Sequence, residues 1–292
     1  APLAGTRLMV MALRVFSLAL NAVTLALAYA LGRRVVPAGR EPWLWLALAL
    51  AAFNPMMLFI GASVSNDNLL RPLSTAGLVL ALAAARTPRP GLHTLAGLGL
   101  VLGLAALTKL SGLVLWPVAA LALAYGGLRP TLDDGRGTTA LGRLVSLIRR
   151  LLFVFSLALA VCGWWYFRNW QLYGDPTGLN AMIAIAGPRS VGLGQLVTQE
   201  WYGFYMSFWA IFGVFTILPG VWAQWFFHAL TLAALAAGAL AAWRNRRALS
   251  FDCLLLAAFC LLTLMGVIRW TMQTPASQGR LLGNQGTSTT VV

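Results

Sequence analysis

Apolar runs of membrane-spanning length dominate this sequence. A helix that crosses the hydrocarbon core of a bilayer needs about 20 apolar residues, with a range of about 17–25. Segments of about this length recur along the chain, and no strand pattern or fixed-period repeat competes with them. They are 8–31, 43–62, 69–85, 92–108, 110–126, 150–167, 217–242 and 250–268. We therefore predict an all-α fold, a polytopic transmembrane helical bundle of about eight helices.

Composition supports a bilayer as the solvent. Hydrophobic residues make up 60% of the 292 residues and charged residues only 10%, whereas soluble domains carry about 25% charged residues. The net charge of +14 raises the question of nucleic acid. The basic residues, however, punctuate apolar runs and form no continuous stripe. We therefore expect lipid, and no nucleic acid, as the partner.

The residues that most often bind metals are scattered. Cys162, Cys253 and Cys260 lie inside apolar runs and have neither metal-ligand nor disulfide spacing. His93 and His228 are isolated, and we expect packing roles for both. No HExxH, GxGxxG or Walker motif occurs. The sequence thus predicts no metal and no cofactor.

Basic residues give the expected orientation. If the loops are numbered alternately, one set holds 13 of the 21 Lys and Arg residues. The positive-inside rule places that set in the cytoplasm, so we expect a multi-pass membrane protein with this set of loops inside. The set comprises Arg33, Arg34, Arg40, Arg86, Arg89, Arg129, Arg136, Arg143, Arg149, Arg150, Arg244, Arg246 and Arg247.

This orientation puts Ala1 on the outer side. No signal peptide precedes the first apolar run, so we expect at least one further helix upstream. Residues 283–292 form a polar tail that does not continue a membrane protein. We interpret residues 1–282 as one transmembrane domain, truncated at both ends.

The longest outer connection, 169–216, contains an amphipathic pattern. Trp201, Phe204, Tyr205 and Phe208 recur at i, i+3, i+4 and i+7. Trp and Tyr favour the headgroup level of a membrane. We expect a helix over about 195–209 that lies in the outer interface, packs against the bundle, or does both.

Polar residues at the outer helix ends need an explanation, because an ionisable group at membrane depth costs about 2.5–3.5 kcal/mol on insertion scales. Asp67 follows Asn66 in a short loop, and capping of the next helix is its simplest alternative role. Lys109 stands between two apolar runs with almost no loop, where it could bind a phosphate or snorkel to the interface.

Two further polar groups complete the outer set. Arg168 ends an aromatic run and could bind a phosphate or anchor the helix, and Arg14 lies within the first helix. Gln278 and Arg280 follow the last apolar run.

The order of these motifs resembles the bacterial GT-C membrane glycosyltransferases. The closest similarity is to the family thirty-nine-like proteins, which are related to protein mannosyltransferases and aminoarabinose transferases, or to a neighbouring family of predicted membrane proteins of unknown function. The resemblance covers roughly residues 8–282. The motifs are Asn54-Pro55 through Ser65-Asn66-Asp67-Asn68, Gly103 through Thr108-Lys109-Leu110-Ser111-Gly112, Trp164 through Trp170 with Tyr173-Gly174-Asp175-Pro176, Ser207-Phe208-Trp209 with Phe212-Gly213, and Ser277-Gln278-Gly279-Arg280.

The resemblance implies a multi-pass protein of the bacterial plasma membrane. It also implies transfer of a sugar from a polyprenyl-phosphate donor to an acceptor at the outer face, in assembly of the cell envelope. It implies a catalytic or orienting role for Asp67. Substrate-binding roles follow for Lys109, Arg168, Arg14, Asn66, Tyr173, Asp175, Gln278 and Arg280. The family's principal acid lies in an outer loop that would precede Ala1, so we expect this fragment to be inactive by itself.

Two other functions fit the same sequence. A transporter or flippase of lipid-linked sugars would line a pathway with intramembrane Arg and Lys. A non-catalytic membrane subunit would leave Asp67 as a cap and Lys109 as an interfacial anchor.

Overall fold

The computed structural model describes residues 2–37, 39–129, 139–186, 192–213, 217–244 and 250–273. These residues are mostly helical, and the part described contains only one isolated β-bridge, between Phe212 and Ile217. This confirms the all-α prediction. The chain divides into two compact units, of which the first comprises residues 1–52, 60–178 and 251–266 and the second comprises residues 53–59, 179–250 and 267–292.

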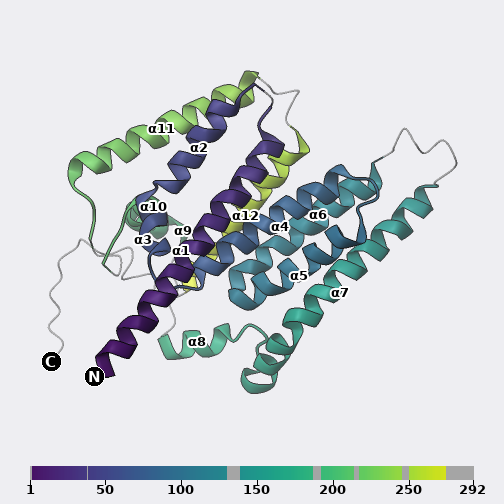
Figure 1. The fold of residues 1–292 in the computed structure, drawn as a ribbon, viewed down its shortest axis with the longest axis horizontal. Coiled ribbons are helices and arrows are strands. Elements are labelled where there is room, and N and C mark those ends of the chain that lie inside the picture. Colours follow the sequence, from purple (N-terminus) through teal and green to yellow (C-terminus); the bar gives the residue numbers. More distant parts are fainter. Residues whose placement is uncertain are drawn as a thin grey trace. The chain divides into compact units, whose positions relative to one another are not determined.

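Unit 1 is a bundle of long helices (Figure 1). Helices α4, α5, α6 and α7 lie side by side, and α1 lies along α4. The elements are α1 (Pro2–Val35), α2 (Glu41–Ala52), α4 (Asp67–Arg86), α5 (Leu92–Thr108), the 3₁₀ helix η1 (Leu110–Val114), α6 (Leu115–Leu128), α7 (Ala140–Tyr173) and the greater part of α12 (Phe251–Gln273).

Unit 2 is built from shorter helices and one long helix. It contains most of α3 (Pro55–Gly61), α8 (Leu179–Ala186), α9 (Leu193–Gln195), the π-helical turn η2 (Leu196–Glu200), α10 (Trp201–Trp209) and α11 (Val221–Arg244). The amphipathic helix expected over about 195–209 is therefore helical, in three consecutive parts.

The lengths of the helices are those of a multi-pass integral membrane protein. Within the described residues, six helices are long and apolar enough to cross a bilayer, and α2 with α3 forms a seventh candidate that is broken after Ala52. The remaining apolar segment is α5, whose 17 residues span about 25 Å at about 1.5 Å per residue. That is slightly less than the roughly 30 Å of a hydrocarbon core. Each apolar segment expected from the sequence thus contributes helix.

Glycines allow α5 to approach α7 closely. A Cβ atom at Gly99 would lie 2.8 Å from the Val154 carbonyl oxygen, and one at Gly103 would lie 2.6 Å from the Val161 Cβ. Because the residue numbers rise together, α5 and α7 run parallel. Small residues four apart on a helix are a common device for close packing in membranes.

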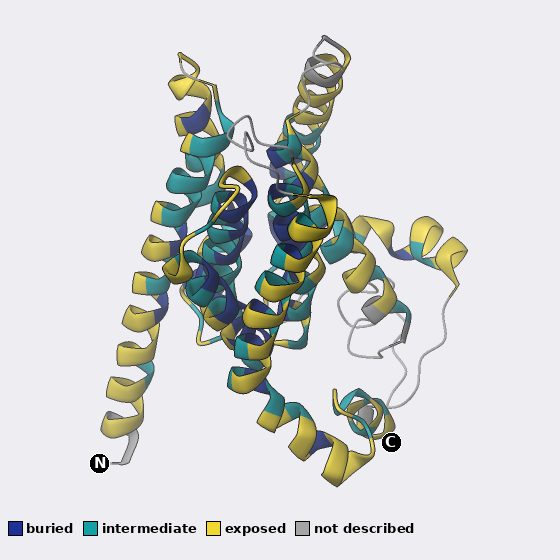
Figure 2. Cartoon of the chain, turned by 90° about the vertical axis from the view of Figure 1, so that its right-hand side faces the viewer, coloured by how far each residue is buried: buried dark blue, intermediate teal, exposed yellow. Residues whose placement is uncertain are grey.

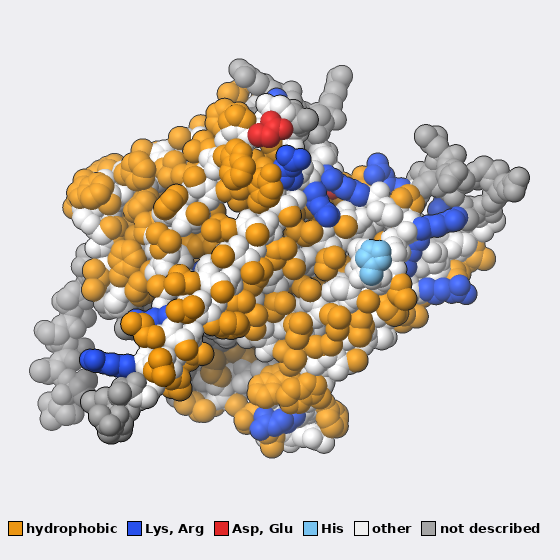
Figure 3. Space-filling model, in the orientation of Figure 1, with side chains coloured by type: hydrophobic (Ala, Val, Ile, Leu, Met, Phe, Trp, Pro, Cys, Tyr) orange, Lys and Arg blue, Asp and Glu red, His pale blue; other side chains and the backbone are white. Residues whose placement is uncertain are grey.

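Burial is concentrated in the α4–α7 group (Figure 2). Its core contains Leu82, Leu98, Leu102, Val118 and Leu123, all of which are almost fully buried. The N-terminal half of α1, beside the N label, is exposed in the same view. The visible molecular surface is largely hydrophobic, with sparse Lys and Arg side chains (Figure 3). An apolar exterior of this kind is stable against lipid and not against water.

Candidate functional site

Asp67 and Lys109 are in direct contact at one end of unit 1. The Lys109 Nζ atom lies 2.7 Å from Asp67 Oδ1 and donates a hydrogen bond to it. Asp67 is the first residue of α4, and Lys109 is the single residue between α5 and η1. Their side chains are 36% and 42% exposed. The tight connections between the helices therefore bring together two residues that are 42 positions apart.

The loop before α4 orients the Asp67 carboxylate. The Ser65 hydroxyl donates to Asp67 Oδ2 at 3.3 Å and accepts from the Asp67 backbone amide at 3.2 Å. The Asn66 side-chain amide donates to the Thr108 carbonyl oxygen at 3.2 Å, which ties this loop to the end of α5. The N-cap position of α4 is Asn66, which makes no capping hydrogen bond with its side chain. Asp67 therefore contacts Ser65 and Lys109 and does not occupy the cap position.

Lys109 owes its position to a sharp reversal of the chain. It has extended backbone angles, and its amide donates to the Ala105 carbonyl oxygen at 3.1 Å. The Gly112 amide then donates to the Lys109 carbonyl oxygen at 2.8 Å. A Cβ atom at Gly112 would collide with the backbone of Ala105, so only glycine lets η1 fold back against α5. The reversal leaves Lys109 at the tip of the helix pair.

A buried polar network begins at Asn68, the residue that follows Asp67 in α4. Asn68 is 1% exposed, and its side-chain amide donates to the carbonyl oxygens of Ile60, at 3.0 Å, and Ser63, at 2.8 Å. Asn21 of α1 donates to Asn68 Oδ1 at 3.4 Å. Arg71 donates to Asn21 Oδ1 at 3.1 Å. Polar groups inside an apolar bundle must satisfy one another in this way.

Arg71 places a second positive charge near Asp67. It stands four residues after Asp67, on the same face of α4, and the Asp67 charge acts on its guanidinium. Lys109 contacts the Asp67 carboxylate and Arg71 stands one turn further along α4, so these three residues together carry a net charge of about +1. Such an excess favours an anionic ligand at this end of the bundle.

A pattern of polar residues in α1 indicates this network in the sequence. Arg14, Ser17, Asn21 and Thr24 recur at i, i+3, i+7 and i+10 of α1, which places them on one helical face. Ser17 and Thr24 are buried, whereas Arg14 is exposed. A polar stripe in an otherwise apolar helix indicates contact with other polar groups.

The aromatic end of α7 belongs to the same end of unit 1, because α7 runs parallel to α5. The Tyr166 hydroxyl donates to the Ala106 carbonyl oxygen at 2.9 Å. Arg168 is exposed, and its guanidinium carbon lies 5.4 Å from the centre of the Trp165 ring. The next residue, Asn169, is buried and donates to the Pro176 carbonyl oxygen at 3.3 Å. Arg168 thus has a cation–π partner within its own helix.

Asp175 organises the turn that follows α7. Its Oδ1 atom accepts hydrogen bonds from the amide and the hydroxyl of Thr177, at 2.9 and 2.8 Å. Gly174 adopts a left-handed conformation with φ of 65°, and its amide donates to the Trp170 carbonyl oxygen. Tyr173, just before this turn, is exposed. The candidates Gln278 and Arg280 lie outside the described residues.

Unit 2 contains a separate aromatic and polar cluster. His228 Nδ1 lies 3.2 Å from the Tyr205 hydroxyl, which lies 2.9 Å from Thr231 Oγ1. The His228 ring also stacks on that of Tyr205, at 5.3 Å. The pKa of the nearby Tyr202 is raised, mainly by burial and further by Tyr205. His228 therefore joins α10 to α11 and is not isolated.

Glu200 is a buried acid that sequence reasoning did not select. It is 1% exposed and ends the π-helical turn η2. Turns of this type often occur at functional sites. Its only sequence signal was its place before the amphipathic aromatic stripe.

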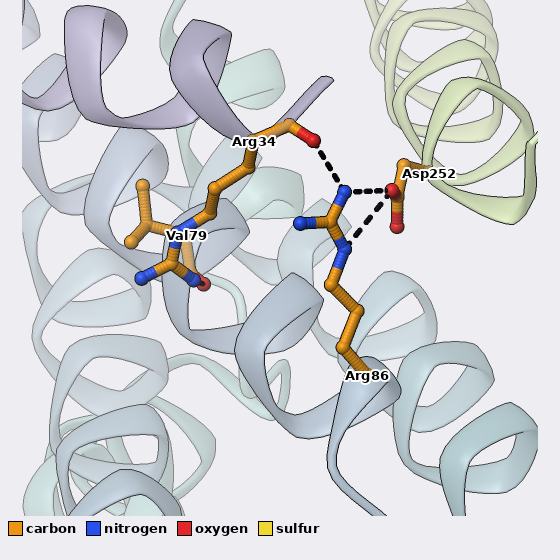
Figure 4. Close-up of polar contacts among 4 residues, drawn as sticks. All are labelled: Arg34, Val79, Arg86 and Asp252. Atoms are coloured by element: carbon orange, nitrogen blue, oxygen red, sulfur yellow. Dashed lines mark hydrogen bonds and ion pairs between the residues drawn. The ribbon is translucent and has the colours of Figure 1, made fainter. Parts of the chain in front are cut away.

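The opposite end of unit 1 contains a second ion pair, between Arg86 at the end of α4 and Asp252 at the start of α12 (Figure 4). Arg86 Nε donates to Asp252 Oδ2 at 3.1 Å, and Arg86 Nη2 contacts the same oxygen and the Arg34 carbonyl oxygen. Arg34 in turn donates to the Val79 carbonyl oxygen at 2.9 Å. Three helices of the unit are thereby linked.

Among the described residues, no group of three or more His, Cys, Asp or Glu side chains could hold a metal ion. Comparison of the chain with protein-family models, curated proteins and solved structures gives no match. The geometry of the site and the motifs of the sequence are therefore the only guides to its function.

Proposed function

We propose that this chain forms part of a membrane glycosyltransferase that uses a polyprenyl-phosphate sugar donor, and that the Asp67–Lys109 pair lies in its site. The observation that supports this proposal is the 2.7 Å contact of Lys109 with Asp67, at the end of an apolar bundle. Both side chains remain partly exposed, so a substrate can reach them. A lipid-linked donor would place its phosphate at this depth while its polyprenyl chain stays in the bilayer.

The chemistry requires stabilisation of a leaving phosphate. The acceptor oxygen forms a bond to the anomeric carbon of the sugar, and the bond from that carbon to the phosphate oxygen breaks. The electron pair of the broken bond stays on the polyprenyl phosphate, and the acceptor proton passes to a carboxylate. A cation already aimed at the phosphate stabilises the developing charge without further reorganisation.

Lys109 and Asp67 would divide these tasks. Lys109 would bind the donor phosphate, and Arg71 would leave the site cationic while Asp67 remains ionised. Asp67 would orient the sugar or the acceptor. Arg168 is a weaker phosphate ligand in this proposal, because it is exposed and already contacts Trp165.

A second candidate function is transport or flipping of a lipid-linked sugar. The observation that favours it is the network of Asn21, Asn68 and Arg71 inside membrane-spanning helices. Intramembrane polar groups of this kind mark pathways in transporters. The two functions differ in their product, since only a transferase joins the sugar to an acceptor.

The decisive experiment measures sugar transfer by the full-length gene product in proteoliposomes that contain a polyprenyl-phosphate sugar. Lys109→Ala should lower turnover by about 10²-fold or more, the scale of losing one electrostatic donor. Asp67→Asn should also lower turnover beyond any loss of folded protein. Glu41→Gln is the matched control, since Glu41 is an exposed acid in the first turn of α2.

Three outcomes of this experiment distinguish the glycosyltransferase from the transporter. Loss of turnover in Lys109→Ala and Asp67→Asn, with normal turnover in Glu41→Gln, supports the proposed site. Normal turnover per folded molecule in both site variants refutes it. Movement of the lipid-linked sugar across the vesicle membrane, without any transfer, would identify a transporter.

A further inference from the structure

Polar side chains of unit 2 form a series of hydrogen bonds that links α10 to α11. His228 Nδ1 lies 3.2 Å from the Tyr205 hydroxyl oxygen, which lies 2.9 Å from Thr231 Oγ1. The Trp209 indole nitrogen donates to the same Thr231 oxygen at 3.0 Å. Thr231 in turn donates its hydroxyl proton to the Phe227 carbonyl oxygen at 2.8 Å. Each proton of this series can therefore be assigned to one bond.

These bonds fix the tautomer of His228. A hydroxyl has a single proton, and that of Thr231 already goes to Phe227. The Tyr205 hydroxyl must therefore donate in its contact with Thr231, and its oxygen can only accept from His228. In the neutral imidazole this puts the proton on Nδ1 and leaves a lone pair on Nε2. His228 is thus oriented through one nitrogen and offers the other as a hydrogen-bond acceptor.

Aromatic rings surround this imidazole. The Tyr205 ring stacks on it, with ring centres 5.3 Å apart. The Trp225 ring meets it edge to face at 5.7 Å, and the Tyr202 ring lies 6.0 Å away. Trp225 and Tyr202 are exposed, whereas His228 is half-buried. Among the residues that the structure describes, no group donates a hydrogen bond to Nε2. The acceptor therefore lies beside two exposed rings.

The Tyr202 ring is also held in place. Its hydroxyl donates to Gln224 Oε1, and Gln224 Nε2 donates to the Pro219 carbonyl oxygen at 2.8 Å. The ring and the acceptor nitrogen are thus both fixed before a ligand binds. Such preorganisation reduces the entropy that is lost on binding.

The position of His228 along α11 limits the kind of ligand. The apolar span of this helix begins at Val221, and His228 follows it by about 10 Å along the axis, at about 1.5 Å per residue. Trp222 and Trp225, near the start of the span, are exposed, and indole rings favour the headgroup level of a membrane. A ligand at this depth is therefore the headgroup of a lipid.

We infer that Tyr202, Trp225 and His228 bind the sugar ring of a glycolipid headgroup. A sugar ring presents C–H groups on its faces and hydroxyl protons at its edge. The slightly positive C–H groups suit the negative face of an aromatic ring, which a phosphate does not. A sugar hydroxyl would donate to His228 Nε2. The inference is independent of the proposed transferase, because neither Asp67 nor Lys109 takes part in it.

The first test observes the imidazole directly. The whole chain is labelled with nitrogen-15 in histidine and purified in an amine-oxide detergent, which contains no sugar. The chain has two histidines, so His93→Phe leaves only the signals of His228. At mildly alkaline pH, NMR should show a protonated Nδ1 and an unprotonated Nε2. Tyr205→Phe removes the acceptor of Nδ1–H and should shift the population toward the Nε2–H tautomer. A protonated Nε2 with Tyr205 intact would overturn the inference.

The second test measures binding by native mass spectrometry of the delipidated chain. The probe is monoglucosyl diacylglycerol, and phosphatidylglycerol and phosphatidylcholine with the same acyl chains are the lipids without a sugar ring. We expect saturable binding of the glycolipid alone. His228→Phe keeps an aromatic ring and should weaken binding about ten-fold, the scale of one lost hydrogen bond. Tyr202→Leu should weaken it about five-fold, the scale of one aromatic contact.

His93→Phe is the matched control for binding, because His93 is an exposed histidine in the first turn of α5. It should change the affinity less than about two-fold, as surface substitutions usually do. Equal binding of the three lipids would show a general apolar contact and overturn the site. Competition by free glucose at the concentration of the glycolipid would replace the lipid with a soluble sugar and also overturn the inference.

Each variant is checked for its thermal unfolding midpoint. His228→Phe leaves Tyr205 with Thr231 as its partner, so we expect it to fold, and unchanged binding in this variant would refute the inference. If it fails to fold, Tyr202→Leu decides, because Tyr202 is exposed near the start of α10. Unchanged binding in Tyr202→Leu would then refute the inference.

Discussion

The ion pair between Arg86 and Asp252 should respond very differently to loss of its two members. The Asp252 side chain is 11% exposed, whereas that of Arg86 is 43% exposed. Arg86→Gln leaves a nearly buried carboxylate without its cation and also removes the donor to the Arg34 carbonyl oxygen. Asp252→Asn leaves a guanidinium that reaches water, opposite a side chain that still offers an oxygen acceptor.

The magnitudes follow from these exposures. Removing one partner of a buried ion pair costs about 3–5 kcal/mol. Asp252 retains some access to water, so we expect a loss of about 3 kcal/mol for Arg86→Gln, at the low end of that range. Asp252→Asn should cost about 0.2–1 kcal/mol, the value of an exposed pair. The double variant should be more stable than Arg86→Gln alone, because it no longer buries an unpaired charge.

The assay is the free energy of unfolding of the purified chain, from titration with a denaturing detergent in mixed micelles. Arg40→Gln serves as the control for the loss of one exposed arginine. Equal losses of stability in Arg86→Gln and Asp252→Asn would refute the reasoning from exposure. The same conclusion would follow if Asp252→Asn failed to relieve the effect of Arg86→Gln.

Three further predictions concern packing, the polar network and topology. Gly103→Val should prevent the close approach of α5 to α7 and lower the yield of folded protein, measured by size-exclusion chromatography. Gly163→Ala is the control and should leave this yield unchanged, because a Cβ atom at Gly163 has no neighbour within 4 Å. Asn21→Leu should cost about 1–3 kcal/mol in the same unfolding titration, because it removes the donor to the buried Asn68 Oδ1 atom. Single cysteines introduced near Arg136 should resist an impermeant thiol reagent in intact cells, and those near Gly174 should react with it, because loops rich in arginine remain in the cytoplasm. The reverse labelling pattern would show that the topology is inverted.

Much of the fold could be predicted because membrane helices are specified by local composition. Each apolar run contributes helix, and the stripe from Trp201 to Phe208 is helical as its spacing indicates. The bounds were less predictable. Helix α7 begins at Ala140 and continues to Tyr173, well beyond the predicted 150–167. Flanking residues such as Arg143 and Trp170 continue the helix because their polar or aromatic ends suit the membrane boundary.

The central contact of the site could be anticipated only in outline. Short connections predict that Asp67 and Lys109 lie at the same end of the bundle. The ion pair between them also depends on how α4 and α5 are rotated about their axes. Apolar faces that look alike in sequence do not specify this rotation. For the same reason the partners of Arg86 and Asn21, which come from distant helices, were missed.

The tight reversal at Lys109 makes the site depend on chain length. One residue added within the 3₁₀ helix η1, which continues directly into α6, would turn α6 by about 120° about its axis, because such a helix has about three residues per turn. The face of α6 that contains Val118 and Ala122 is buried, and it would then point away from α4. Insertions that move this cation would therefore also disassemble the core. Homologous chains should vary in length at their Gly- and Asp-rich loops and keep the spacing from α5 to α6 constant.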